Sequence, residues 1–422
     1  MSVARKVNCT GVRQRNAVGV TMALMPFRAY FLLALALILG VALAAQTRKV
    51  TGAEVARVQR SVILIDTHND VTSFTVDGLD IGPRRATGHT DLERLREGGV
   101  GATFFAAFVD KKYVKTNDSA RRTLEMIDTI RHDIVDRYPG QVRLALTARD
   151  IETAHRQHKF AALIGIEGGH AIEDSLRLLR EYYALGVRYM TLTHVNTNNW
   201  ADSSGDVDDP TVTHHNGLTP FGRDVVREMN RLGMMVDISH VADKTFWDAL
   251  EASTAPPFAS HSSCRAVSNI PRNMTDEMIV ALAKKGGVVD VNFGCEFVSQ
   301  KSADAGMPWM HRIMAAPNDE ERNALMEQYR KEIVRAHLDD AVAHIDHVVK
   351  IAGIGAVGIG SDFDGVECTP IGLDDVSKYP NLTRALLERG YSARDIRLIY
   401  GGNVLRVMRA VEAESARLRA TK

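Results

Sequence analysis

The sequence predicts an α/β fold, a (β/α)₈ TIM-type barrel with a helical insertion before the last strand. Eight short apolar runs alternate with helical patterns along the chain, an order typical of parallel βαβ units. A doubly wound open sheet is the alternative, but the glycine-rich dinucleotide fingerprint is missing after the first strand. The barrel is therefore the favoured fold.

The composition is that of an ordinary globular protein. Of 422 residues, 45% are apolar and 25% are charged, and this length is enough for one barrel with insertions. Lys+Arg and Asp+Glu both number 52, so the formal net charge is zero. This balance argues against a nucleic-acid-binding protein, because such proteins carry an excess of basic residues.

Residues 1–45 resemble a secretory signal peptide. A basic region precedes a continuous apolar run from Tyr30 to Ala45, and small residues close this run. An uncleaved membrane anchor is the alternative, although the run is close to the lower length limit for one. Either interpretation implies export to the periplasm or the extracellular space. Any membrane association would occur only through this N-terminal segment. The remaining chain, 46–422, is predicted to be the barrel domain.

The expected strands are short apolar runs, several of them rich in β-branched residues. They are Ser61–Ile65, Ala102–Phe108, Ala161–Ile166, Tyr189–Thr193, Met234–Ile238, Phe258–Ser260, Gly287–Asn292 and Ala356–Gly360. The expected helices are Asp91–Gly98, Ser119–Arg137, Ser175–Ala184, Thr219–Leu232, Thr245–Glu251, Thr275–Lys285, Asn381–Arg389 and Ser392–Ala413. Thr219 and Pro220 suit the N-cap and the first position of their helix.

A charged segment, Ser299–Asp340, separates the last two expected strands. It is predicted to be helical and to form a lid or an interface. A solvated surface excursion is an equally good interpretation.

Three cysteines follow the leader: Cys264, Cys295 and Cys368. They lack the CxxC spacing of a thiolate metal site. Their odd number leaves one disulfide or an intermolecular bond open.

His68 and Asp70 follow the first expected strand and lie two positions apart. If the strand geometry continues, both side chains point the same way, so an imidazole and a carboxylate face one point. Such a pair suits a divalent transition metal ion. Taken alone, the pattern is better explained by a structural turn.

Five other expected strands also end in residues that can bind metal. Glu167 ends the third strand, and Gly168 and Gly169 after it allow a sharp turn and the close approach of a ligand. The fourth, fifth, sixth and eighth strands are followed by His194, His240, His261 and Asp362. Singly, each has an ordinary explanation such as a loop hydrogen bond, a salt bridge or a turn. Jointly they would bury several charges at the mouth of a barrel, and bound metal would offset that cost.

Five of these residues form a ligand set for two metal ions: His68, Asp70, Glu167, His240 and His261. One catalytic zinc ion usually takes only three protein ligands. A carboxylate has two oxygens, so Glu167 is suited to bridge two ions roughly 3.5–4 Å apart, together with a water or hydroxide. Nitrogen and oxygen ligands favour zinc, with manganese or cobalt as substitutes. Because such a pair activates water and polarises a carbonyl, we expect hydrolysis of an amide or ester.

In their order, these motifs resemble the membrane dipeptidase (renal dipeptidase) family of zinc metallopeptidases, a branch related to the amidohydrolase barrels. The matching segments lie within roughly residues 60 to 410 and are Asp66–Asp70, Glu167–His170, Leu192–His194, Ser239–His240, Ser260–Ser263, Pro271–Asn273 and Gly360–Gly365. Two features depart from the family pattern. Thr67 stands where glycine is common, and the Ser299–Asp340 segment is longer than expected.

The resemblance implies a role for each residue. The zinc ligands would be divided as His68 and Asp70 on one ion, His240 and His261 on the other, and Glu167 on both. His194 would hold the oxyanion or the substrate carbonyl, and Arg272 would bind the C-terminal carboxylate of the substrate. Asp362 would face the free amino group and pass a proton to the leaving amine, so Glu167, His194 and Asp362 are the expected catalytic residues.

The family hydrolyses dipeptides and often accepts a D-residue at the C-terminal position, and some members open β-lactam rings. Family precedent also suggests a homodimer. These properties are implied by the resemblance, and the sequence does not identify the preferred dipeptide.

Three functions are compatible with these patterns. The favoured one is an exported dipeptidase with two zinc ions per subunit, which attacks the peptide bond with a metal-bridging hydroxide. The second is another amidohydrolase-type barrel acting on a lactone, lactam or phosphoester. Arg272 and Asp362 argue against it, because together they match both ends of a zwitterion. The third is a non-catalytic metal- or peptide-binding protein, which metal-dependent dipeptide turnover would distinguish from the first.

Overall fold

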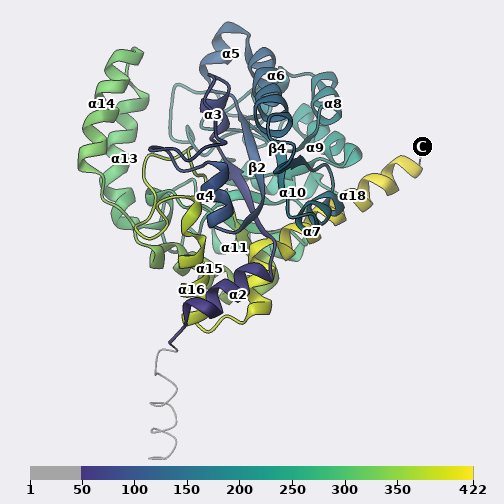
Figure 1. Ribbon diagram of the computed structural model, residues 1–422. Coiled ribbons are helices and arrows are strands. Elements are labelled where there is room, and N and C mark those ends of the chain that lie inside the picture. The colour runs from purple at the N-terminus through teal and green to yellow at the C-terminus, as the bar shows by residue number, and fades with distance from the viewer. Residues whose placement is uncertain (1–48, 422) are drawn as a thin grey trace, which may run out of the picture. The chain divides into compact units, whose positions relative to one another are not determined.

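The computed structural model describes residues 49–421, so the leader predicted over 1–45 lies outside the described residues. Parallel strands form the centre of the described chain and helices surround them (Figure 1). The strands are β1 (Leu64–Asn69), β2 (Val100–Phe108), β3 (Val142–Leu144), β4 (Phe160–Glu167), β5 (Val187–Thr191), β6 (Met235–Asp237), β7 (Ala259–Ser262), β8 (Val289–Val291) and β9 (Val357–Ile359). Within the described residues, no helix is both long enough and apolar enough to cross a membrane.

The strands are arranged in two parallel sheets. The first has the order β1-β2-β4-β5-β6, with β3 paired to β4, and the second has the order β7-β8-β9. Parallel bridges from Asp237 to Phe258 and from Asn69 to Phe363 join the edges of the two sheets. The Ile238 N–H donates to the Phe258 carbonyl oxygen and the Asp70 N–H to that of Phe363, each over 2.9 Å. The predicted parallel α/β fold is confirmed, and this curled sheet is consistent with a TIM-type barrel.

The first expected strand, Ser61–Ile65, is wrong at both ends. Ser61 caps the preceding helix, its N–H donating to the Val58 carbonyl oxygen, and β1 begins at Leu64. The strand then continues to Asn69, because its polar residues remain buried and paired with β2. The apolar run therefore identified the strand but not its polar end. Strand β3 was not expected from the sequence at all.

Helices follow most of the strands and cover the sheet (Figure 1). The α-helices are α2 (Gly52–Arg60), α3 (Thr72–Thr75), α4 (Leu92–Glu97), α5 (Lys112–Thr116), α6 (Ser119–Thr129), α7 (Ala148–Arg156), α8 (Leu176–Ala184), α9 (Pro220–Leu232), α10 (Asp243–Ala252), α11 (Asp276–Lys284), α12 (Cys295–Val298), α13 (Gln300–Met314), α14 (Asp319–Glu332), α15 (Leu338–Ala352), α16 (Tyr379–Glu388), α17 (Ala393–Arg397) and α18 (Asn403–Ala420). Short 3₁₀ or π segments are η1 (Ile130–Asp136), η2 (Gly169–Ile172), η3 (Ile354–Ala356), η4 (Val376–Lys378) and η5 (Leu398–Gly402). Helix α9 begins as predicted, because the Thr219 side chain accepts from the Gly222 N–H and Pro220 is first.

The helix expected over Ser392–Ala413 is present but is not a single α-helix, because the π segment η5 joins α17 to α18. Gly401 lies in this segment, and a Cβ there would stand 2.4 Å from the Ile63 carbonyl oxygen. Glycine thus allows the helical segment to approach the start of β1 more closely than any side chain would.

The segment between β8 and β9 contains α12 to α15, and α13 and α14 lie beside each other in Figure 1. A disulfide joins Cys295, at the start of α12, to Cys368 in the loop after β9. Cys264 is a free, buried thiol. The disulfide that the sequence left open therefore ties together the segments that follow the last two strands.

Asp66 of β1 forms a buried polar link to β9 and α16. It accepts hydrogen bonds from the Ser361 N–H (2.8 Å), the Ser361 hydroxyl (2.6 Å) and the Tyr379 hydroxyl (3.0 Å). Burial raises the pKa of Asp66 to about 6, although these hydrogen bonds oppose the shift. The link stabilises the junction between the first and last strands.

Replacing Asp66 with alanine (Asp66→Ala) should lower the free energy of unfolding by about 3 kcal/mol, because it leaves buried donors of Ser361 and Tyr379 without an acceptor. Urea unfolding followed by circular dichroism measures this. The matched control is Asp77→Ala, since Asp77 is exposed. Equal stability of the two variants would show that the link contributes nothing.

Candidate metal centre

The residues predicted to form the site lie at the carboxyl ends of the strands, the position of active sites in barrels. His68 and His261 lie within β1 and β7, and Glu167 is the last residue of β4. The remaining positions follow strand ends or lie in a loop after one: Asp70, His194, His240, Arg272 and Asp362. The topology therefore brings all eight predicted residues to the same end of the sheet.

Glu167 lies at the centre of the cluster. Its Oε1 is 2.9 Å from His240 Nε2, 3.2 Å from His261 Nε2 and 3.8 Å from His194 Nε2. Its Oε2 is 3.5 Å from His68 Nε2. The two carboxylate oxygens thus face different imidazoles, which is the geometry that a bridging ligand requires.

Asp70 and Asp362 complete the cluster on the side of His68. Asp70 Oδ2 is 3.1 Å from His68 Nε2, and Asp362 Oδ1 is 4.0 Å from it. Although both are buried, His68 Nε2 and Asp70 Oδ2 have no hydrogen-bond partner. Buried polar atoms without partners are costly, so two that face each other indicate a site for a cation.

Three overlapping groups have ligand atoms within 4.8 Å of one another: His68, Glu167 and His261; Glu167, His194 and His240; His68, Asp70 and Asp362. Their donors are imidazole nitrogens and carboxylate oxygens, without a thiolate. This donor set fits a divalent transition metal ion. The residues present therefore fit a metal cofactor.

The electrostatics keep His194, His240 and Glu167 in the form that binds metal. Burial lowers the pKa of His240 to about 3 and that of His194 to about 4, so both imidazoles are neutral near pH 7. Burial opposes ionisation of Glu167, but the neighbouring imidazoles hold its pKa well below the usual range. A neutral imidazole and an ionised carboxylate are the states that bind a metal ion.

Residues beneath the cluster orient two of the imidazoles. His68 Nδ1 lies 2.7 Å from the Tyr189 hydroxyl, and His261 Nδ1 lies 2.7 Å from the Ser260 hydroxyl. The Ser260 hydroxyl in turn donates to Asp237 Oδ2 over 2.6 Å. Such contacts fix the ring orientation of a metal ligand. The sequence did not predict these roles for Tyr189 and Asp237. The signal available for them was a polar side chain inside an otherwise apolar strand.

Unusual backbone conformations also position the site. His240 and Asp362 have left-handed φ values of 67° and 63°, which a residue other than glycine rarely adopts. Gly168 has φ 104°, and a Cβ on Gly169 would lie 2.3 Å from the Leu192 carbonyl oxygen. The predicted need for glycine after Glu167 is thus explained by a positive φ and a close backbone approach.

Arg272 lies beside the cluster with part of its guanidinium engaged. It donates to the His261 carbonyl oxygen over 2.7 Å and to the Ser262 hydroxyl over 2.8 Å, and it stacks on Phe297. Its buried Nε has no partner, and within residues 49–421 no carboxylate lies within ion-pair distance of the guanidinium. An unpaired guanidinium here is suited to bind a carboxylate.

Asn292, just after β8, was not predicted. Its Nδ2 donates to Asp362 Oδ2 over 2.7 Å, so it holds this carboxyl group in place. Asp362, which follows β9, is thereby oriented by a residue that follows the neighbouring strand β8. The seventh expected strand, Gly287–Asn292, ends in an amide, which is not among the side chains that usually bind a transition metal ion.

The comparisons with known proteins identify the family of this chain. The family model of the membrane dipeptidases (Peptidase family M19) matches residues 52–422. The chain belongs to this family. The dipeptidase is 38% identical to the dipeptidase verJ of Clonostachys rogersoniana over 376 residues, 85% of this chain and 87% of that protein. It is 36% identical to the uncharacterized dipeptidase C965.12 of Schizosaccharomyces pombe, over 84% of this chain and 82% of that one.

Solved structures show the same relationship. The probable dipeptidase PvdM of Pseudomonas aeruginosa is 25% identical with a TM-score of 0.75, over 86% of this chain and 98% of that one. The dipeptidase AC, an M19 metallopeptidase, is 25% identical with a TM-score of 0.67, over 83% of this chain and 98% of that one. The predicted family is confirmed, and the protein is a hydrolase with the TIM-like amidohydrolase fold.

Replacing Glu167 with alanine (Glu167→Ala) in the dipeptidase should lower metal affinity at least about ten-fold, because the carboxylate at the centre of the ligand set is lost. Metal content of the purified protein after dialysis, measured by mass spectrometry, tests this. The control is Glu181→Ala, an exposed carboxylate on α8. Unchanged metal content in Glu167→Ala would contradict the central position of Glu167.

Proposed function

We propose that the protein is an exported, zinc-dependent dipeptidase that holds two ions per subunit and accepts a D-residue at the C-terminal position of its substrate. The observation that carries this is the convergence on Glu167 of histidines from three different strand ends, beside an unpaired guanidinium. The family and the named dipeptidase relatives support the reaction class.

The residues divide into two ligand sets. His68 and Asp70 would hold one ion, His240 and His261 would hold the other, and Glu167 would contribute to both sets. The nitrogen and oxygen donors favour zinc. When bound, the pair would lower the pKa of a water between the ions and polarise the scissile carbonyl.

Both ends of the substrate are bound by this chain's own side chains. Arg272 binds the C-terminal carboxylate through the N–H groups that its protein contacts leave free. Asp362, held by Asn292, faces the free amino group. Because both termini are held, a third residue would not fit, which restricts the substrate to dipeptides.

Two residues assist the reaction beyond binding. His194, neutral and 3.8 Å from Glu167, is placed to donate to the substrate carbonyl oxygen as negative charge develops there. Asp362 would take up the proton that the attacking water loses and pass it to the leaving amine. Glu167 contributes by holding the two halves of the site at a fixed separation.

The location and the assembly belong to the same proposal. Residues 1–45 direct export and are then cleaved or retained as an anchor, and the Cys295–Cys368 disulfide is typical of an oxidising compartment. The barrel domain over 46–422 is a closed (β/α)₈ barrel in which α13 and α14 form the insertion before the last strand. This insertion would contribute to the rim of the site or to the contact in a homodimer.

The purified protein should hydrolyse L-Ala-D-Ala, and a chelator should abolish this activity until zinc is restored. This substrate is chosen because a phosphinate mimic of it is bound to the Rhodobacter sphaeroides metallopeptidase, 24% identical with a TM-score of 0.68. Release of alanine measures turnover, and the tripeptide L-Ala-L-Ala-L-Ala is the control for length. Hydrolysis that persists after metal removal, or equal hydrolysis of the tripeptide, would overturn the proposal.

Replacing Arg272 with alanine (Arg272→Ala) should raise KM for dipeptides about 100-fold, because a charge-assisted bond to the substrate carboxylate is lost. The KM for the same dipeptide as its C-terminal amide, which lacks the carboxylate, should hardly change. Steady-state kinetics on both substrates measure the difference. If both substrates respond alike, Arg272 does not bind the carboxylate.

A further inference from the structure

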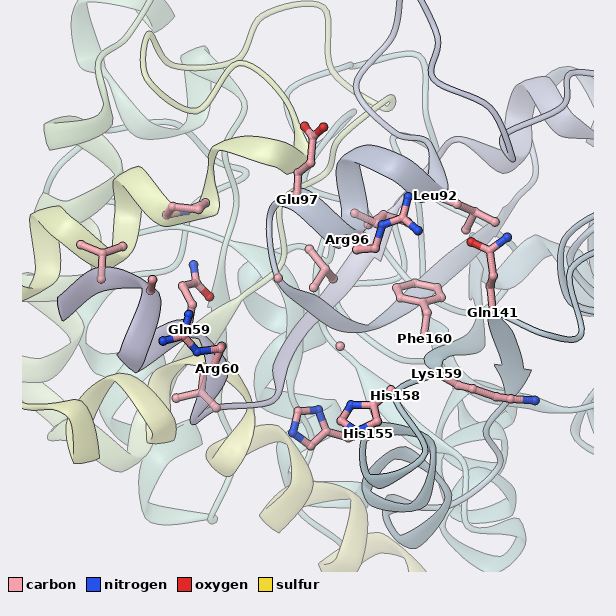
Figure 2. A pocket seen from close by; sticks show the side chains of 18 of the residues that line it. Gln59, Arg60, Leu92, Arg96, Glu97, Gln141, His155, His158, Lys159 and Phe160 are labelled. Atoms are coloured by element: carbon pink, nitrogen blue, oxygen red, sulfur yellow. The ribbon is translucent and has the colours of Figure 1, made fainter. Parts of the chain in front are cut away.

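A cavity of about 860 Å³ lies at the amino ends of the strands, the opposite end from the metal centre (Figure 2). Val62, Val100, Val142 and Phe160, at or just before the starts of β1 to β4, form its floor. Helices α2, α4, α7 and α16 form its sides. Its size is that of a site for a small organic molecule.

The inner surface of the cavity is apolar. Val55 of α2 and Leu92 and Leu95 of α4 add to the valines and Phe160 of the floor, and Figure 2 shows the Phe160 ring in the middle of the view. Such a surface binds a hydrocarbon or aromatic group by removing it from water. The reactive groups of the metal centre have no part in it.

The rim is cationic. Arg60 and Arg96 line the cavity, and within residues 49–421 their guanidinium groups form no ion pair and no hydrogen bond. Lys159 and Arg384 also line it, and each donates to a backbone carbonyl oxygen rather than to a carboxylate. The charges of the rim therefore remain available to an anion.

One carboxylate, Glu97, also lines the cavity, but it is already neutralised. It pairs with Arg84 over 2.5 Å, and Figure 2 shows its side chain directed away from Gln59 and Arg60. The cavity thus combines an apolar floor with uncompensated positive charge, and this combination matches an amphipathic anion.

Gln59 supplies an independent observation. Its side chain lines the cavity, and its amide nitrogen and oxygen are both buried without a hydrogen-bond partner. Leaving both groups of an amide unpaired is costly in a native structure. A polar head of a ligand would satisfy them once the Gln59 side chain turns toward the cavity.

We propose that this cavity is a second binding site, for an amphipathic organic anion with a carboxylate or phosphate head and an apolar tail. The tail lies on Phe160 and the valines of the floor, and the head is held at the rim by Arg60 or Arg96 with Gln59. Since the cavity opens at the other end of the strands, its ligand does not compete with the dipeptide.

Calorimetric titration with octanoate and octyl phosphate tests the proposal, with acetate and inorganic phosphate as matched anions that lack a tail. The eight-carbon anions should bind, and the tail-less anions should bind at least about ten-fold more weakly. Whichever of octanoate and octyl phosphate binds more tightly shows whether the site prefers a carboxylate or a phosphate head. Affinity should not change when a phosphinate dipeptide mimic occupies the metal centre.

The variant R60A/R96A should weaken octanoate or octyl phosphate binding about ten-fold or more, while dipeptide hydrolysis stays unchanged. The single variants R60A and R96A show which residue holds the head. The control R57A/R177A removes the same charge from exposed positions that do not line the cavity. No binding by either eight-carbon anion, displacement by the dipeptide mimic, or equal loss in the control would overturn the proposal.

Discussion

The contact between the Glu167 carboxylate and its surrounding imidazoles is the interaction on which the site depends. Three histidine nitrogens lie within 3.5 Å of its oxygens, although each comes from a different strand end. Burial alone would disfavour a charged carboxylate, and it is the neighbouring imidazoles that keep Glu167 ionised. The donors converge only because the parallel strands all end at one face of the curled sheet.

Two buried acids below the site hold the strands in place. Asp66 joins β1 to β9 and α16, and Asp237 joins β6 to β7 by accepting from the Ser260 N–H over 2.9 Å and from its hydroxyl. These are the two places where the six-stranded and three-stranded sheets meet. The same polar contacts that stabilise the junctions also reach the imidazole cluster, since Ser260 contacts His261. Fold and site share one hydrogen-bond network.

Local patterns in the sequence predicted much of the fold and the metal cluster. The eight expected strands occur in the expected order, because a buried parallel strand must be an apolar run whatever surrounds it. His68, Glu167, His240 and His261 come together because each lies within or directly after such a strand. The errors have equally local causes: β1 extends through polar residues paired with β2, and η5 interrupts a helix where Gly401 meets the backbone of Ile63.

The sequence alone determined which side chains stand at strand ends, and hence the donor types, because strand periodicity and strand ends are local properties of the chain. Only the tertiary structure decided which donors touch, that Asn292 orients Asp362, and that Cys295 rather than Cys264 pairs with Cys368. It also revealed the cationic cavity at the amino ends of the strands. These features join residues far apart in the chain, and their contacts depend on the curvature of the sheet and the packing of helices, which no local pattern specifies.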